Sequence, residues 1–290
     1  MSALFGPAGN SQSFQEMGYK KTIQVPEYLN RMGLDIYEYQ CGHGVRISEK
    51  AAQEFGQEAK EKGILLSVHS PYYISLSSVE EEKREKGIDY IIQTAQAAHA
   101  MGADRIVIHS GSCAKISREE ALSLAGDTLL RAQKKLDELG MEEIHLCPET
   151  MGKFNQLGDF GEVMALCRLE DRFIPCIDFG HLNARTLGQI NSTDAFQQLL
   201  TTMEQVLGTE RAHHFHAHFS KIEYTEKGGE KRHLTFEDTL YGPEFEPLGE
   251  LLAKGNYSPR IICESAGTQA EDARQMKELY QNAVGKAENQ

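Results

Sequence analysis

The chain has 290 residues, enough for one large α/β barrel or two ordinary domains, and 40% of them are hydrophobic, which supports a full-sized core. The net charge of −13 argues against the excess of lysine and arginine typical of nucleic-acid binders, although divalent cations bound at one edge would attract a phosphodiester even to an acidic protein. No apolar stretch approaches the ~18 residues of a membrane span, and the first residues lack the features of a secretion signal, so we expect a soluble protein in the cytoplasm.

Short apolar runs that look like strands alternate with segments of helical apolar spacing. The expected strands are residues 2–5, 35–40, 64–70, 105–110, 143–149, 173–178, 213–219 and 260–264; they are short, and several are β-branched. Strand-to-strand distances of about thirty residues or more leave room for a crossover helix, as parallel pairing requires. The pattern predicts an α/β fold: one (β/α)8 TIM barrel domain over residues 1–290.

The segments between strands show helix boundaries. In residues 89–103 an apolar stripe ends at Gly102, and in residues 117–140 Ser117 precedes Glu120 in a capping-box pattern before the run ends at Gly140. Residues 221–241 show no such pattern. We expect them to form a long irregular loop after the seventh strand, on the rim where barrel chemistry resides.

Residues that can ligate a metal stand at the ends of six expected strands. They are His69, His109, Glu149, Asp178 with His181, His216 and Glu264. A lone strand-end histidine is more often structural, but parallel strands bring all of these ends to one rim, so the repetition predicts a metal site there. Imidazoles mixed with carboxylates indicate zinc, manganese or iron. His218 points the same way as His216 by period-two alternation and is a further candidate.

These segments resemble the endonuclease IV family of apurinic/apyrimidinic endonucleases, within the wider group of xylose-isomerase-like TIM barrels. The similarity covers nearly the whole chain. Its motifs are GPAG, HSPYYISLSS around His69, IHSGS around His109, PETMGKFNQLG around Glu149, CIDFGHLNA around Asp178 and His181, then HAHFSK, RHLTF and CES.

The resemblance implies a metal-dependent hydrolase that cuts DNA on the 5′ side of an abasic site with a metal-activated water. Its metal ligands would be His69, His109 and Glu149 for a first ion, Glu149 with Asp178, His216 and Glu264 for a second, and His181 with His233 for a third. Glu149, Glu264 and Asp178 would be the catalytic residues. The implied cofactor is zinc, as two or three ions, with manganese or iron as alternatives.

The chain departs from the family pattern at two places. Lys231 stands where the family has an aspartate two residues before the histidine that matches His233, and a protonated lysine cannot ligate a divalent ion. We therefore expect two tightly held metals and a weak or absent third, unless Glu230 or His218 replaces the missing ligand. The second departure is the segment CGHGVR, where the family has a loop that penetrates damaged DNA.

The expected substrate-binding residues are Tyr72, Tyr73, Lys221, Lys231 and Arg232. Tyr72 matches the family's DNA-facing aromatic, and tyrosines at the rim would fill or stack in the gap left by a missing base. The implied partner is damaged DNA, with no membrane involved.

The alternative from another enzyme class is a sugar or sugar-phosphate isomerase or epimerase on the same barrel. Such enzymes usually need one metal, and Glu149 and Glu264 would move the protons. The negative charge and Lys231 favour this alternative, whereas His109, His181 and the pair Arg232 and His233 favour the nuclease. A third hypothesis is a barrel without catalysis that binds a phosphorylated ligand or damaged DNA.

Overall fold

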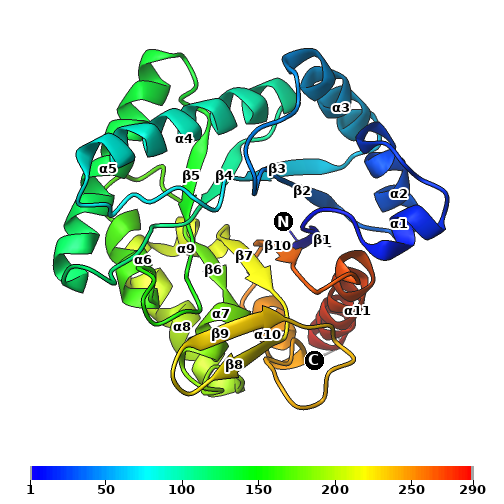
Figure 1. The fold of residues 1–290 in the computed structure, drawn as a ribbon. Helices are drawn as coiled ribbons and strands as arrows, with labels where there is room; N and C mark the ends of the chain where they lie inside the picture. Colours follow the sequence, from blue (N-terminus) through cyan, green and yellow to red (C-terminus); the bar gives the residue numbers. More distant parts are fainter. Residues whose placement is uncertain (1, 289–290) are drawn as a thin grey trace.

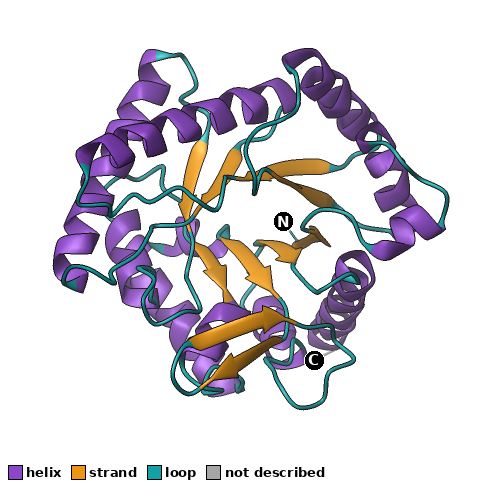
Figure 2. Ribbon diagram, in the orientation of Figure 1, coloured by secondary structure: helices purple, strands orange, loops and turns teal. Residues whose placement is uncertain are grey.

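Eight parallel strands form a ring inside a layer of helices in the computed structural model, which describes residues 2–288 (Figures 1 and 2). The ring strands are β1 Leu4–Pro7, β2 Ile36–Gln40, β3 Leu65–His69, β4 Arg105–Ile108, β5 His145–Pro148, β6 Cys176–Asp178, β7 His216–Phe219 and β10 Arg260–Cys263. Each lies at an expected strand position, shifted or shortened by a few residues. The predicted order of strands is therefore confirmed.

The ring closes at two seams between four-stranded parallel sheets. The sheets have the orders β1-β10-β7-β6 and β2-β3-β4-β5. Parallel bridges from Ala8 to Glu38 and from Glu149 to Cys176 join them. At the first seam a Cβ on Gly6 would lie 1.6 Å from the Ile36 carbonyl oxygen, so this approach of β1 to β2 requires glycine. These contacts confirm the barrel.

The outer layer consists of the helices that connect successive strands. They are α1 Gln12–Glu16, α2 Val25–Met32, α3 Glu49–Glu61, α4 Glu81–Met101, α5 Arg118–Glu138, α6 Phe160–Cys167, α7 Phe179–Arg185, α8 Thr193–Leu207, α9 Thr209–His213, α10 Glu246–Lys254 and α11 Gln269–Glu288, with a 3-10 turn at Thr22–Gln24. Among the helices in the described part of the chain, none is long and apolar enough to cross a membrane.

The predicted helix ends are confirmed where the sequence marks them. Helix α4 ends at Gly102 in the left-handed conformation, with φ 71°. The Ser117 hydroxyl caps α5 by accepting a hydrogen bond from the Glu120 amide at 3.1 Å. Gly140 follows the end of α5 with φ 72°.

The main hydrophobic core lies between the strands and the helices, and the barrel interior differs from it. Fully buried side chains such as Phe5 and Ile91 belong to the main cluster, whereas Val107, Cys147 and Cys176 form a separate small one. The interior also contains buried polar side chains, among them Glu38, His216 and His218. Buried charged and polar groups need partners, so this interior is organised by specific polar contacts.

The expectation of an irregular loop over residues 221–241 is wrong for residues 222–233, whereas residues 234–241 form no helix or strand. Strands β8 Ile222–Thr225 and β9 Gly229–His233 form an antiparallel hairpin that lies beside α7 in Figure 1. Charged residues dominate β9, so the apolar alternation that marks a strand is missing from the sequence. The Glu230 amide donates a hydrogen bond to the Gly152 carbonyl at 3.1 Å, which fixes the hairpin to the segment after β5.

Candidate metal centre

Histidine and carboxylate side chains gather at the carboxyl ends of the strands. Three groups have nitrogen or oxygen atoms within 4.8 Å of one another: His69, His109 and Glu149; Glu149, Asp178, His218 and Glu264; and His181, Glu230 and His233. The first two groups share Glu149. These three groups bring together seven of the eight ligands expected from the sequence and add His218 and Glu230. The eighth, His216, lies in a fourth group with Cys176 and His218.

The first group is centred on one carboxylate oxygen. Glu149 Oε2 lies 3.0 Å from His109 Nε2 and 3.4 Å from His69 Nε2. His69 Nδ1 lies 2.8 Å from the Ser70 carbonyl oxygen, so it is the donor and Nε2 faces the cluster. Two ligand atoms about 2 Å from a tetrahedral ion lie about 3.3 Å apart, so these separations suit ligands of one ion.

The second group corrects the expected position of His216. His218 Nδ1 lies 3.1 Å from Glu149 Oε1 and 3.5 Å from Glu264 Oε2. His218 pairs in register with Asp178, whereas His216 pairs with Cys176 one layer deeper. Alternation places both histidines on the interior face, but only the strand register sets their depth. His218 therefore occupies the place in this group that the sequence assigned to His216.

Glu230 supplies the carboxylate of the third group. Its Oε2 lies 3.5 Å from His181 Nε2, while His181 Nδ1 donates to the Thr150 carbonyl oxygen at 2.9 Å. A Cβ on Gly152 would lie 2.6 Å from Glu230 Cβ, so the absent side chain at residue 152 gives Glu230 room. Of the two replacements considered for the missing aspartate, the structure selects Glu230.

Opposite charges within the centre shift its pKa values strongly. Burial alone would raise the pKa of Glu149, but the imidazoles of His218 and His109 outweigh it and hold that pKa well below its usual value. Burial also opposes charge on His218, yet the surrounding acidic groups raise its pKa well above the usual value. The pKa of Asp178 is raised to about 7, mainly by burial. In this protonation pattern, imidazolium charge balances the buried carboxylates.

The donor atoms fit divalent metal ions. Glu149 Oε2 and Asp178 Oδ2 are buried and form no hydrogen bond within the described residues, and the nearest ion-pair contact of each is an imidazole nitrogen, of His109 at 3.0 Å and of His181 at 3.2 Å. A buried carboxylate oxygen without a partner is costly unless a positive charge faces it. A set of imidazole nitrogens and carboxylate oxygens suits zinc and similar transition metals.

The expected substrate-binding residues fall into two kinds. Tyr72 and Tyr73 are half-exposed, and the Tyr72 ring centroid lies 5.2 Å from that of His69. Lys221 is buried, with Nζ 2.6 Å from both the Asp238 carbonyl oxygen and Glu244 Oε1. Its ammonium therefore binds within its own loop, which does not match the expected contact with substrate.

Lys231 and Arg232 share one carboxylate. Lys231 Nζ lies 2.5 Å from Glu223 Oε1, and Arg232 Nε lies 2.6 Å from Glu223 Oε2. Both cationic side chains remain largely exposed. Glu223 therefore neutralises part of the positive charge that the sequence suggested for a phosphate backbone.

A hollow of about 410 Å³ opens beside the centre. Its lining includes Tyr72, His233 and Glu264 and the amide side chains of Asn10, Gln40 and Gln269. The sequence interpretation missed these three amides, and a single sequence offers no signal for them because asparagine and glutamine are common in surface loops. Their side chains line the hollow together with the polar groups of Tyr72, His233, Glu264 and Ser265.

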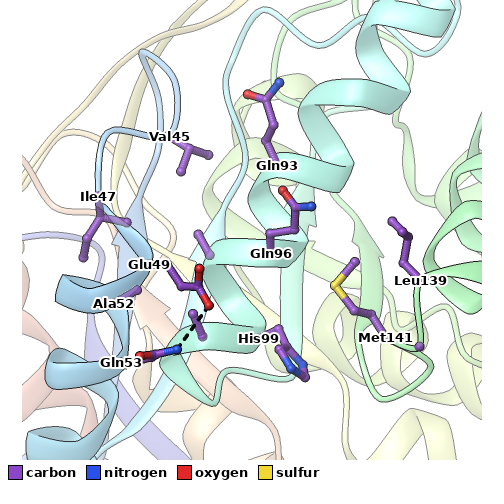
Figure 3. A pocket seen from close by; sticks show the side chains of 13 residues that line it. Val45, Ile47, Glu49, Ala52, Gln53, Gln93, Gln96, His99, Leu139 and Met141 are labelled. Atoms are coloured by element: carbon purple, nitrogen blue, oxygen red, sulfur yellow. Dashed lines mark hydrogen bonds between the residues drawn. The ribbon is translucent and has the colours of Figure 1, made fainter.

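A larger hollow of about 660 Å³ lies outside the barrel between α3 and α4 (Figure 3). Its lining includes Val45, Ile47, Gln96, His99 and Met141. His99 is paired with Glu143, with Nδ1 2.5 Å from Oε1. This hollow has none of the three ligand groups, so size alone does not identify the chemical site.

The family follows from a comparison of sequences. A model described as "Xylose isomerase-like TIM barrel" matches residues 26–283, and the chain belongs to that family. An uncharacterized protein of Methanocaldococcus jannaschii is 35% identical over 265 residues, covering 90% of this chain and 91% of that protein. A probable endonuclease 4 of Acholeplasma laidlawii is 27% identical over 218 residues, 72% of each chain. These matches confirm the resemblance to the endonuclease IV family.

Two solved structures illustrate how widely this fold is used. Endonuclease IV from Thermus thermophilus superposes with a TM-score of 0.70 at 16% identity, covering 98% of this chain and 100% of its own. A D-tagatose 3-epimerase-like protein gives 0.67 at 17% identity, covering 88% and 90%. At these identities the likeness concerns the fold alone, and it includes two classes of enzyme.

Proposed function

We propose that the protein is a metal-dependent phosphodiesterase similar to endonuclease IV that cleaves DNA on the 5′ side of abasic sites. Its cofactor is zinc, held as two or three ions by the three ligand groups. The main support is that the centre contains more potential ligands than the four residues that a single ion needs. The additional ligands are His69, His109, His181, Glu230 and His233.

Sharing of Glu149 between two groups supports a polynuclear centre. Its Oε2 faces His69 and His109, while its Oε1 faces His218. A carboxylate with a different set of imidazoles on each oxygen suits a bridge between two ions. Two-metal sites of this kind are typical of phosphodiester hydrolysis.

Bound ions would lower the pKa of the attacking water and offset charge on the phosphate and on the leaving oxygen. The chain's residues hold and orient the reactants. Glu264 lines the rim hollow and is placed to orient the water, and Asp178 shares this task from the end of β6. The pKa of Glu264 is held at about 2: burial would raise it, but His218 outweighs burial. Glu264 is therefore an anion that accepts hydrogen bonds.

The rim offers aromatic surface to an abasic nucleotide. Tyr72 lines the hollow beside Glu264 and His233, and Tyr73 is equally exposed. An abasic nucleotide is extruded at lower cost than a paired one, and an aromatic ring fills the gap that it leaves. Lys231 and Arg232, on the exposed hairpin, would contact backbone phosphates after leaving Glu223.

A second candidate is a sugar or sugar-phosphate epimerase. Glu149, Asp178, His218 and Glu264 alone can hold one ion, and Glu149 and Glu264 would exchange protons with a ketose. The pairing of Lys231 and Arg232 with Glu223 and the net charge of −13 favour a small substrate over a polyanion.

Two measurements distinguish these candidates. Elemental analysis gives the number of metals per chain, and incision of an abasic duplex is compared with and without a chelator. The nuclease requires more than one metal and chelator-sensitive incision that an intact duplex does not undergo. One metal per chain, no incision and metal-dependent exchange of ketose C–H protons would replace the nuclease with the epimerase.

A further inference from the structure

Glu38 is a buried carboxylate in the middle of β2 that no ligand group includes. It is fully buried inside the barrel and faces Ser67 of β3 in register. A carboxylate in this position costs several kcal/mol unless it is paired and hydrogen-bonded. Its partners therefore indicate why it is there.

Two histidines of β7 lie on the two oxygens of Glu38. His216 Nε2 is 2.9 Å from Oε2, and His218 Nε2 is 3.0 Å from Oε1. The Ser67 hydroxyl donates to Oε2 at 3.0 Å and the Gln40 amide to Oε1 at 3.3 Å. Three hydrogen bonds, from His216, Ser67 and Gln40, and one ion-pair contact with His218 thus hold the carboxylate in one orientation.

His218 directs Nδ1 toward the centre, whereas other histidines of the centre direct Nε2 toward it. His69, His181 and His233 each have Nδ1 within 2.9 Å of a carbonyl or hydroxyl oxygen, which leaves Nε2 for the centre. In His218, Nδ1 faces Glu149 and Glu264, whereas Nε2 faces Glu38. In the described residues His218 Nε2 forms no hydrogen bond, and its close polar contact is the ion pair with Glu38 Oε1 at 3.0 Å.

We propose that Glu38 is a positioning residue that keeps the proton of His218 on Nε2 and thereby presents Nδ1 to the metal shared with Glu149, Asp178 and Glu264. A carboxylate behind a metal-binding imidazole fixes its tautomer and orientation and raises its basicity. The inference rests on the proposed metal centre. His216 then acts as a support for Glu38 rather than as a metal ligand.

The same carboxylate links the centre to the rim hollow. Gln40 donates to Glu38, and its Oε1 accepts a hydrogen bond from the Tyr72 hydroxyl at 3.2 Å. Gln40 and Tyr72 both line the hollow. Glu38 thus orients a metal ligand directly and a candidate substrate contact through one intervening amide.

The test uses the full chain and Glu38→Gln, which removes the charge and keeps the shape. Zinc affinity is measured by competition with a chelator, and imidazole proton–nitrogen NMR gives the tautomer of zinc-bound His218. We expect Nε2–H in the wild type, and in Glu38→Gln a mixed or reversed tautomer with zinc held about 10–100-fold more weakly. Glu162→Gln is the matched control, because Glu162 is also a buried carboxylate but binds Arg118; it should keep both wild-type values.

Two further variants keep the test informative if Glu38→Gln does not fold. Ser67→Ala removes one hydrogen bond to Glu38 and should weaken zinc binding by about 2–10-fold. His216→Gln keeps a donor near Glu38 and should retain the wild-type number of metals. Unchanged affinity and tautomer in Glu38→Gln, or unchanged affinity in Ser67→Ala if it alone folds, overturns this inference alone. A wild-type protein that binds no zinc overturns the proposed metal centre as well.

Discussion

Glu230 Oε2 lies 3.5 Å from His181 Nε2, although the residue aligned with the family's ligand is the adjacent Lys231. The hairpin of β8 and β9 turns Lys231 toward Glu223 and Glu230 toward the centre. One position along a strand reverses the direction of a side chain. The candidate ligand of the third group thus stands one residue earlier in β9 than the family pattern led us to expect.

Glu230→Gln should selectively remove the third metal. The amide loses the anionic oxygen facing His181 and His233, so we expect metal content to fall by one per chain while the other ions remain. Elemental analysis after gel filtration measures this. Gly152→Ala should act in the same direction, since the added Cβ would lie 2.6 Å from Glu230 Cβ. Lys231→Ala is the control with unchanged metal content; loss of the third metal in that variant would contradict the assignment.

Glu149→Gln should have a much broader effect. Because Glu149 belongs to two ligand groups, we expect lower metal content and a rate reduced by ~100-fold or more. Metal analysis and single-turnover incision of an abasic duplex measure both. His99→Gln is the control, because His99 lies on the outer surface and pairs with Glu143. Full metal content and rate in Glu149→Gln would remove Glu149 from its bridging role.

The stability of the metal-free protein should fall as pH rises above about 6.5. His181 and His218 have raised pKa values because nearby acidic groups, Asp178 first for His181 and Cys176 first for His218, outweigh burial. Their stabilisation is therefore complete below the unfolded pKa of ~6.5 and is lost at higher pH. Asp178, with its pKa raised to about 7 mainly by burial, also loses stabilisation as pH rises from ~3.8 to 7.

Glu264 and His216 determine how the stability of the metal-free protein changes at acidic pH. The pKa of Glu264 is about 2 because His218 outweighs burial, so its stabilisation is lost as pH falls below ~4.5. Burial lowers the pKa of His216 to about 4, so its contribution is lost as pH falls below ~6.5. Thermal unfolding of chelator-treated and zinc-loaded protein across this range is the measurement. Equal melting temperatures for both forms at pH 8 would argue against zinc replacing these protons.

Glu223→Gln should strengthen binding to abasic DNA. Loss of the carboxylate frees Lys231 and Arg232 for phosphates, so the slope of log affinity against log salt should steepen by about one unit for each new contact. Fluorescence anisotropy at several salt concentrations measures the slope. The double variant Lys231→Ala with Arg232→Ala should weaken binding at low salt and flatten the slope. If neither variant changes the slope, the hairpin does not contact a phosphate backbone.

Local patterns in the sequence were enough to predict the barrel and most of the candidate centre. Apolar runs separated by helical segments identified the strands, because burial and backbone hydrogen bonding impose the same local pattern wherever the fold occurs. His69, His109 and Glu149 were predictable as neighbours because each stands at a strand end, and parallel strands bring their ends to one rim.

Which side chains meet at a given depth depends on long-range contacts that become visible in the folded barrel. His216 and His218 share one face of β7, and pairing with β6 places His218 beside Asp178. Glu38 gave no signal, because a glutamate in an expected strand looks like a solvated residue until the barrel closes around it. Residues 229–233 have no apolar alternation, and their pairing with β8 and contact with Gly152 brought Glu230 to His181. Register, barrel closure and hairpin docking are long-range contacts, and local sequence patterns do not specify them.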